Sequence, residues 1–310
     1  MLKLQTNLGK HLDVEMEKDY SNPAPALKLI GFGLLAFAIT ILAGGIWSGL
    51  LIANLQSAPA APWSVPVMAT VLWLAWSYLG GKGPPRGTSD LRRHYLRANP
   101  NPIRVYIWAC VAGGFGVIAL AGLWIVLVQL IRMPPNVFSN MSAYPRLTVA
   151  LMIVMGSLVS PFMEEADFRG YFQVALERRY RGPVAIAISS IVFALAHGPT
   201  QGFLWPKLFF YFLVGVTFGT TAYLTNSILP AIPVHFAGLL IFFTLIWPRD
   251  TARPLVLLAG PDHWFSIHSA QAVLFTALAI WAFQQLARVA TQYASARSDE
   301  TQHYPDRPTL

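Results

Sequence analysis

Two adjacent glutamates, Glu164 and Glu165, directly follow a long apolar run, and Arg169 lies four residues after the second. A charged side chain inside an apolar span costs a few kcal/mol or more, so these residues are functional candidates. On a helix Glu165 and Arg169 share a face and can pair, whereas Glu164 points about 100 degrees away. The pattern favours a supporting Glu165 and a Glu164 that takes a proton from water. The alternative is that the carboxylates only mark the end of a span.

Two of the seven histidines, His197 and His235, fall inside other apolar runs. Phe193 lies one helical turn before His197, on the same face. A lone histidine in such a run is more often a packing residue. However, if the helix with Glu164 turns back at residues 180–182, Glu164 and His197 are each about 16 residues from the turn. In an antiparallel pair at 1.5 Å rise per residue they then lie level with each other.

Two carboxylates and two imidazoles that converge in a dry helical bundle suit hydrolysis. A glutamate can activate water, and histidines can ligate a divalent metal or polarise a carbonyl group. Two histidines with one glutamate are a known zinc ligand set, so Glu164, His197 and His235 are expected to bind a divalent metal such as Zn²⁺. A metal-free glutamate and histidine mechanism remains open. The expected catalytic residues are Glu164, Glu165, Arg169, His197 and His235.

The elements that must position these residues are membrane-spanning helices. A span needs about 20 mostly apolar residues, whereas period-two alternation typical of strands is missing. Gly45 with Gly49 and Gly215 with Gly219 have the spacing that lets helices approach closely. The prediction is an all-α, polytopic transmembrane helical bundle of about eight spans, at 27–55, 64–81, 103–131, 147–164, 183–203, 208–224, 228–247 and 266–287.

Composition supports a membrane protein, since 55% of the residues are apolar and 12% are charged, against about 25% charged in soluble domains. The net charge of +8 comes from short basic clusters between apolar runs, which argues against nucleic acid as a partner. The clusters at 82–104 and 178–181 predict cytoplasmic loops. Both termini are then cytoplasmic, with the active site toward the cytoplasmic half of the bilayer. The single cysteine, Cys110, excludes an internal disulfide framework.

The predicted organisation has five parts. They are a cytoplasmic N-terminal segment at 1–26, N-terminal transmembrane helices at 27–146, a catalytic core at 147–247, an outer loop with the last transmembrane helix at 248–294, and a disordered tail at 295–310. The N-terminal segment mixes acidic and basic residues before any apolar run, which is unlike a cleavable signal peptide. The first span is therefore expected to direct membrane insertion.

The motif Glu-Glu-x-x-x-Arg at 164–169, the motif Phe-x-x-x-His at 193–197 and His235 together resemble the CPBP family, the CAAX prenyl endopeptidase and bacteriocin-processing (Abi) membrane proteases. The resemblance covers 147–247. It implies an all-helical bundle and proteolysis, in which the first glutamate activates water near the histidines. The family is called a metalloprotease family, and a metal-free mechanism is also argued for relatives.

One position departs from the family pattern. Many relatives have Asn or Asp four residues after the last histidine, where that side chain assists the oxyanion, and this chain has Leu239.

Three functions follow. The first is an intramembrane endopeptidase acting on a membrane-associated peptide or protein in the lipid bilayer. The second is a catalytically silent bacteriocin-immunity or scaffolding protein of the same fold, which Leu239 favours. The third is a transporter with a proton relay through Glu164, Asp167, His197 and His235.

Overall fold

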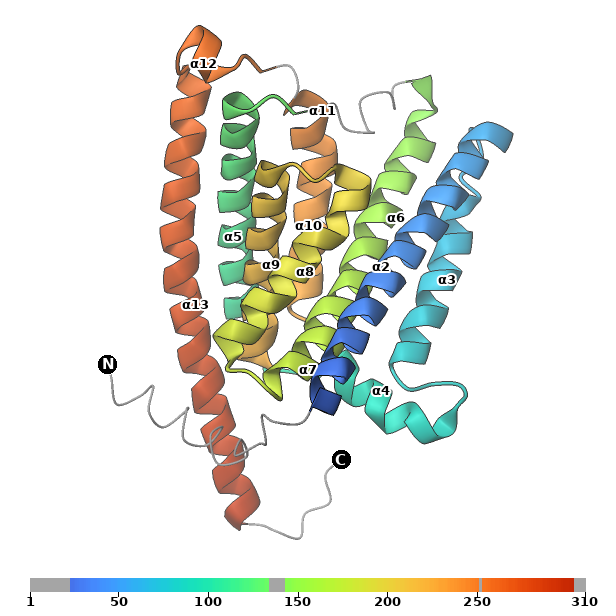
Figure 1. Cartoon of the computed structure of the whole chain (residues 1–310), viewed down its shortest axis with the longest axis vertical. Coiled ribbons are helices and arrows are strands. Elements are labelled where there is room, and N and C mark those ends of the chain that lie inside the picture. The colour runs from blue at the N-terminus through green and yellow to red at the C-terminus, as the bar shows by residue number, and fades with distance from the viewer. Residues whose placement is uncertain (1–22, 134–142, 251–252, 304–310) are drawn as a thin grey trace.

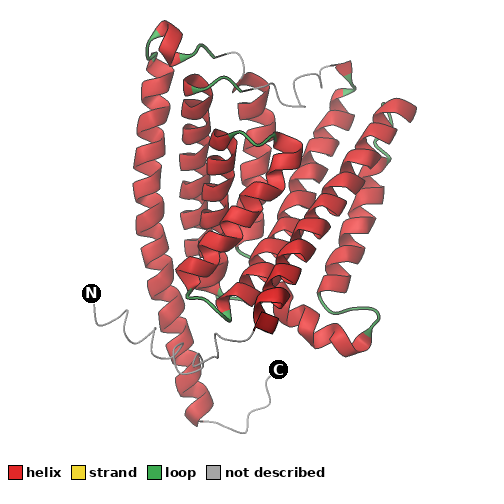
Figure 2. Cartoon of the chain, viewed as in Figure 1, coloured by secondary structure: helices red, strands yellow, loops and turns green. Residues whose placement is uncertain are grey.

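The structure is a computed structural model that describes residues 23–133, 143–250 and 253–303, and within these ranges every element is a helix or a loop (Figure 2). The predicted all-α fold is confirmed. Six helices are long and apolar enough to cross a membrane, and two shorter apolar helices accompany them, at Ser64–Leu79 and Ala231–Ile246. Together these eight helices occupy the ranges that the sequence predicts.

The apolar helices, long and short, form a bundle in which successive helices run in opposite directions (Figure 1). They are α2 (Pro23–Ser57), α3 (Ser64–Leu79), α5 (Ile103–Leu130), α6 (Arg146–Glu164), α8 (Gly182–Gln201), α9 (Trp205–Thr225), α10 (Ala231–Ile241) and α13 (His263–His303). The shorter pieces are the 3₁₀ turn η1 (Arg86–Thr88), α4 (Ser89–Leu96), the π-helix η3 (Glu165–Phe172), α7 (Gln173–Glu177), the π-helix η4 (Phe242–Ile246), α11 (Trp247–Asp250) and α12 (Val256–Ala259).

The alternation of directions places the start of α2 and the end of α13 at the same end of the bundle (Figure 1). The short helices α4 and α7 lie at this end, and α12 lies at the other. An even number of crossings is the basis for the prediction that both termini share one side of the membrane. Which side that is remains a prediction. The predicted N-terminal segment at 1–26 lies mostly outside the described residues, as does the end of the predicted tail.

A buried amide joins α2 to α3. The side chain of Asn54 is fully buried, and its Nδ2 donates hydrogen bonds to the carbonyl oxygens of Ala58, at 2.9 Å, and Ala61, at 2.8 Å. Its Oδ1 accepts a hydrogen bond of 2.8 Å from the backbone N–H of Ser64. Because this N–H begins α3 and has no partner within its own helix, Asn54 caps α3 from the preceding helix. The hairpin is thereby held as a unit, and α2 lines the site described below.

The chain leaves regular α geometry at the residues of interest, where α6 continues into the π-helix η3. A π-helical turn leaves backbone groups without their usual intrahelical partners and is frequent at functional sites. Ser189 of α8 donates a hydrogen bond of 2.9 Å to the carbonyl oxygen of Phe168. At Gly170 a Cβ would lie 2.8 Å and 2.9 Å from the carbonyl oxygens of Tyr95 and Leu96, so glycine permits α4 to pack on η3. The sequence pattern predicts a continuous helix here but not its π geometry.

Two expectations about loops and tails need correction. The predicted loop at 82–104 contains η1 and α4, because Leu96 and Tyr95 pack into the core while Arg93 and His94 face outward. The predicted disordered tail begins at 295, but α13 continues to His303, and the sequence from 282 to 303 has neither glycine nor proline to end it.

The two glycine pairs behave differently. A Cβ at Gly215 would lie 2.7 Å from the Cβ of Ser190, which confirms a close approach of α9 to α8. At Gly45 and Gly49 a Cβ would meet nothing within 4 Å among the described residues, so the predicted close approach on α2 is not found in this part of the chain.

Candidate active site

Three predicted residues from three helices converge inside the bundle. Glu164 ends α6, His197 lies in the last turns of α8, and His235 lies in the first turns of α10. The Nε2 atom of His197 is 4.0 Å from Oε1 of Glu164, and that of His235 is 3.8 Å from Oε2 of the same carboxylate. The Ser160 hydroxyl donates a hydrogen bond to Oε1 of Glu164. The expectation that Glu164 and His197 lie level, with His235 in reach, is confirmed.

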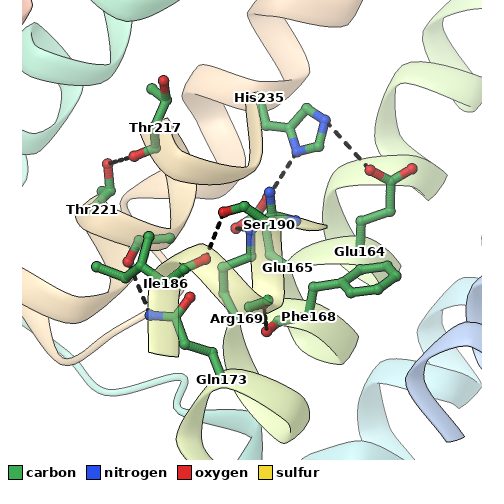
Figure 3. A network of polar contacts seen from close by, with 12 residues as sticks. Glu164, Glu165, Phe168, Arg169, Gln173, Ile186, Ser190, Thr217, Thr221 and His235 are labelled. Atoms are coloured by element: carbon green, nitrogen blue, oxygen red, sulfur yellow. Dashed lines mark hydrogen bonds and ion pairs between the residues drawn. The ribbon is translucent and has the colours of Figure 1, made fainter. Parts of the chain in front are cut away.

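A second carboxylate orients His235 (Figure 3). Glu165 is fully buried, and its Oε1 lies 2.9 Å from Nδ1 of His235. Its other oxygen, Oε2, is 3.6 Å from Nε of Arg169, so the predicted ion pair is present. The imidazole of His235 also stacks on the ring of Phe218, with centroids 4.5 Å apart. Glu165 thus ties the first turn of η3 to α10 and sets the direction of the His235 ring.

Arg169 is held by aromatic rings as well as by Glu165. Its guanidinium carbon lies 4.2 Å from the ring centroid of Phe193 and 5.8 Å from that of Phe218, distances typical of cation–π contacts. Only 1% of the residue is exposed, and its two Nη atoms have no hydrogen-bond partner among the described residues. Phe193 also contacts the ring of His197, with centroids 4.5 Å apart. The Phe-x-x-x-His motif therefore supports both Arg169 and His197.

Hydrogen bonds select the tautomer of each histidine. Nδ1 of His197 lies 2.9 Å from the carbonyl oxygen of Phe193, and a carbonyl oxygen can only accept, so Nδ1 carries the hydrogen. The same argument applies to Nδ1 of His235 against an ionised Glu165. In the neutral imidazoles Nε2 is then unprotonated, and both Nε2 lone pairs face Glu164. Each ring can accept a hydrogen bond there, ligate a cation, or donate once it is protonated.

The distances between the Glu164 oxygens and the two Nε2 atoms limit what can bind between them. A contact of 3.8 to 4.0 Å is too long for a direct hydrogen bond, but one water at about 2.8 Å from each partner spans it at about a right angle. Two ligands of a tetrahedral zinc, each at about 2.1 Å, lie only about 3.4 Å apart. Within the described residues no group of three or more His, Cys, Asp or Glu side chains is placed to hold a metal ion. The donor types fit zinc, whereas the separations fit water.

These three side chains line a cavity of about 530 Å³. Its wall comes from α2, α5, α6, α8, α9, α10 and η4, and most of it is apolar. Leu239, one turn after His235, lies in this wall, so no side-chain amide is present at that position. Trp47 on α2 and Trp247 at the start of α11 lie in the wall as well. A polar cluster thus opens into a space suited to an apolar group.

Asp167, a member of the transport relay considered above, lies apart from the other three residues of that relay. Asp167 is fully buried, and its Oδ2 accepts a hydrogen bond of 3.0 Å from Thr40 of α2. It is absent from the described lining of the cavity, whereas Thr40 is part of that lining. Sequence reasoning also missed Tyr211, whose ring stacks on His197 with centroids 3.9 Å apart. Nothing in the pattern of α9 distinguishes this tyrosine from a packing residue.

The bundle and its site define a class of protein, a multi-pass helical membrane protein with a carboxylate and two imidazoles at an internal cavity. Residues 146–241 match the family described as type II CAAX prenyl endopeptidase Rce1-like. This match, over about a third of the chain, confirms the resemblance to the CPBP family and indicates, at family level, a CAAX-type intramembrane protease. Neither the curated proteins nor the solved structures gave a match. All five predicted site residues lie within the matched segment.

Proposed function

We propose that the protein is an intramembrane endopeptidase that hydrolyses a peptide bond of a membrane-associated protein or peptide, with Glu164 as general base. The observation that carries the proposal is the convergence of the Glu164 carboxylate with two Nε2 lone pairs at an internal cavity. The family match supports proteolysis. The apolar wall of the cavity suits a substrate that reaches the site from the bilayer.

In the proposed reaction one water lies between Glu164 and Nε2 of His235 and donates one hydrogen bond to each. Glu164 takes a proton from this water while its oxygen bonds to the scissile carbonyl carbon, which forms a tetrahedral oxyanion. The bond between this carbon and the peptide nitrogen then breaks, and Glu164 returns the proton to the leaving nitrogen. The products are a carboxylic acid and an amine, and Glu164 ends in its starting state.

The remaining residues position the base and the water. Glu165 holds the proton on Nδ1 of His235, so that Nε2 of this ring accepts a hydrogen bond from the attacking water. Arg169 balances the charge of Glu165 in a buried environment. Phe193 fixes the orientation of the His197 ring, because its carbonyl oxygen accepts the Nδ1 hydrogen.

A divalent metal is a second way to use the same lone pairs. Glu164, His197 and His235 would hold it, and it would make bound water more acidic and polarise the carbonyl group. The three side chains would have to move about half an ångström closer than they lie here. The mechanism above is therefore derived from the side chains alone, and metal analysis decides between the two.

The proposed orientation places both termini and the α4–α7 end of the bundle in the cytoplasm. Arg86, Arg93, Arg178 and Arg181 are exposed at this end, and basic residues in short loops remain on the cytoplasmic side. Tagging of each end in sealed membrane vesicles, followed by protease digestion from outside, tests this orientation.

The test of the base is Glu164→Gln in protein reconstituted into liposomes, assayed with a library of quenched fluorescent peptides carrying membrane anchors. Removal of a general base should slow cleavage about 100-fold to 10,000-fold. Glu177→Gln is the matched control, because Glu177 lies on the same continuous helix but pairs with Arg97 and does not line the cavity. Wild-type turnover in Glu164→Gln would show that another group is the base.

Leu239 supports a second candidate, a silent immunity or scaffolding protein of the same fold, because an apolar side chain in the wall cannot hydrogen-bond an oxyanion. If Glu164→Gln still complements loss of the gene in cells, this second function is favoured.

A further inference from the structure

Hydrolysis at this site requires a hydrogen-bond donor for the oxyanion, and the described groups leave few candidates. Removal of such a donor typically slows an enzyme by about 100-fold to 1,000-fold. The neutral imidazoles of His197 and His235 present lone pairs, not hydrogens, toward Glu164. Leu239 has no polar hydrogen. In these tautomers the oxyanion donor comes from elsewhere in the cavity wall.

Five residues with hydroxyl groups line the described part of the wall, and three of these groups are already committed; of the other two, Ser48 and Tyr211, it is Tyr211 that stacks on His197. Ser160 donates to Glu164, Thr40 donates to Asp167, and Thr200 donates to the carbonyl oxygen of His197. These bonds leave the three hydroxyls without a free hydrogen for an incoming oxyanion.

Tyr211 has the properties that the missing donor requires. It lines the cavity, and its ring stacks on the imidazole of His197 at a centroid separation of 3.9 Å and an interplanar angle of 20°. His197, on which the ring stacks, has its Nε2 atom 4.0 Å from Oε1 of Glu164. The Tyr211 hydroxyl makes no hydrogen bond to any other residue in the described ranges, so its hydrogen is free. Phe193 and Phe210 contact the ring as well, and these contacts hold it in place.

We propose that the Tyr211 hydroxyl donates the hydrogen bond that stabilises the oxyanion of the tetrahedral intermediate. Tyr211 is then a catalytic residue of the proposed protease, and this inference rests on that proposed function. The hydroxyl does not change its protonation state in this role. It donates to the carbonyl oxygen as negative charge develops there, and the bond weakens again when the carbonyl re-forms.

The experiment compares Tyr211→Phe with Tyr223→Phe, which makes the same substitution on the same helix at a position outside the cavity lining. Both are assayed with the peptide that the wild type cleaves and with its phosphonate analogue, whose tetrahedral anion mimics the intermediate. Tyr211→Phe should lower kcat about 100-fold with little change in KM, and should weaken inhibition by the phosphonate by a similar factor. Tyr223→Phe should leave both unchanged.

Three results would overturn the inference while leaving the base assignment in place. They are wild-type kcat in Tyr211→Phe, an equal weakening of substrate and phosphonate, and a loss confined to KM. Each would show that the ring packs against His197 without contacting the oxyanion. By contrast, the proposed function itself fails if the wild type and Glu164→Gln cleave every anchored peptide at the same rate, or if neither cleaves any. The role of Tyr211 then fails with it.

Discussion

Replacement of Glu165 by Gln tests how this carboxylate holds Arg169 and His235 in place, because it contacts both. Its Oε2 lies 3.6 Å from Nε of Arg169, and its Oε1 lies 2.9 Å from Nδ1 of His235. Exposed fractions of 0% for the Glu165 side chain and 1% for that of Arg169 show that water does not screen the pair. Loss of one partner of a buried ion pair costs about 3 to 5 kcal/mol, since the other charge is left uncompensated. We expect Glu165→Gln to be less stable by this amount.

The same substitution should slow catalysis in the protein that remains folded. A glutamine amide can donate a hydrogen to Nδ1 of His235, which moves the ring proton to Nε2 and removes the lone pair that faces Glu164. The corresponding change in an Asp–His–Ser triad lowers kcat by about 10,000-fold. We expect a loss of about 100-fold to 10,000-fold, because His197 retains its own tautomer.

The assay combines thermal unfolding in detergent, followed by tryptophan fluorescence, with cleavage measured well below the melting temperature. Glu177→Gln is the control, since Glu177 forms a bidentate pair with Arg97 at 2.9 Å and 2.9 Å, away from the cavity. The control should lose stability but retain the turnover of folded protein. The double variant of Glu165→Gln with Arg169→Gln should be more stable than Glu165→Gln alone, by about 1 kcal/mol or more. Unchanged melting and unchanged kcat in Glu165→Gln would refute the reasoning.

Three further predictions concern packing, pH and metal. Gly215→Ala should destabilise the protein by about 1 to 3 kcal/mol in thermal unfolding, since its Cβ would lie 2.7 Å from Ser190, whereas Gly45→Ala should change stability by about 0.5 kcal/mol or less. Burial, with the nearby Arg178 and Arg97 charges, lowers the pKa of His94 below its usual 6.5, and Arg178 donates to its Nε2 at 2.7 Å. The contribution of His94 to stability should therefore be complete above pH 6.5 and should be lost as the pH falls through the lowered pKa. Amide hydrogen exchange of α4, measured against pH, should show this loss of protection. The protection in His94→Gln should not change over the same pH range. Metal analysis of purified protein should find less than one bound zinc per chain if water occupies the site, and near-stoichiometric zinc that is lost in His197→Ala would establish the metalloprotease mechanism instead.

The site could be predicted from the sequence largely because charged residues are rare in apolar spans. Glu165 and Arg169 are four residues apart, so helix geometry alone places them on one face. Glu164 and His197 are equally far along the chain from the turn between their helices, so antiparallel packing of these helices brings the two side chains together. His235 was found because it is one of only two histidines in the apolar runs. These inferences need only the rise and rotation of a helix.

Other features depend on tertiary contacts that spacing does not reveal. The π-helix η3 is stabilised by Ser189 from α8 and by the fit of Gly170 against α4, and neither partner is adjacent in sequence. The contact of Tyr211 with His197 depends on the rotation of α9 about its own axis, which a uniformly apolar helix does not encode in its pattern. Gly45 and Gly49 have the same spacing as Gly215 and Gly219, yet among the described residues only the second pair meets a neighbouring helix.

The ion pair between Glu165 and Arg169 also bears on how the chain enters the bilayer during synthesis. Both residues lie in η3, so they can neutralise each other as soon as this segment is helical, before α8 and α10 have been made. If the two charges were unpaired, the free energy of inserting this segment into the membrane would be higher. His235, the other partner of Glu165, arrives only after three further helices have been translated. The residue that later orients a histidine can thus first ease the integration of its own helix.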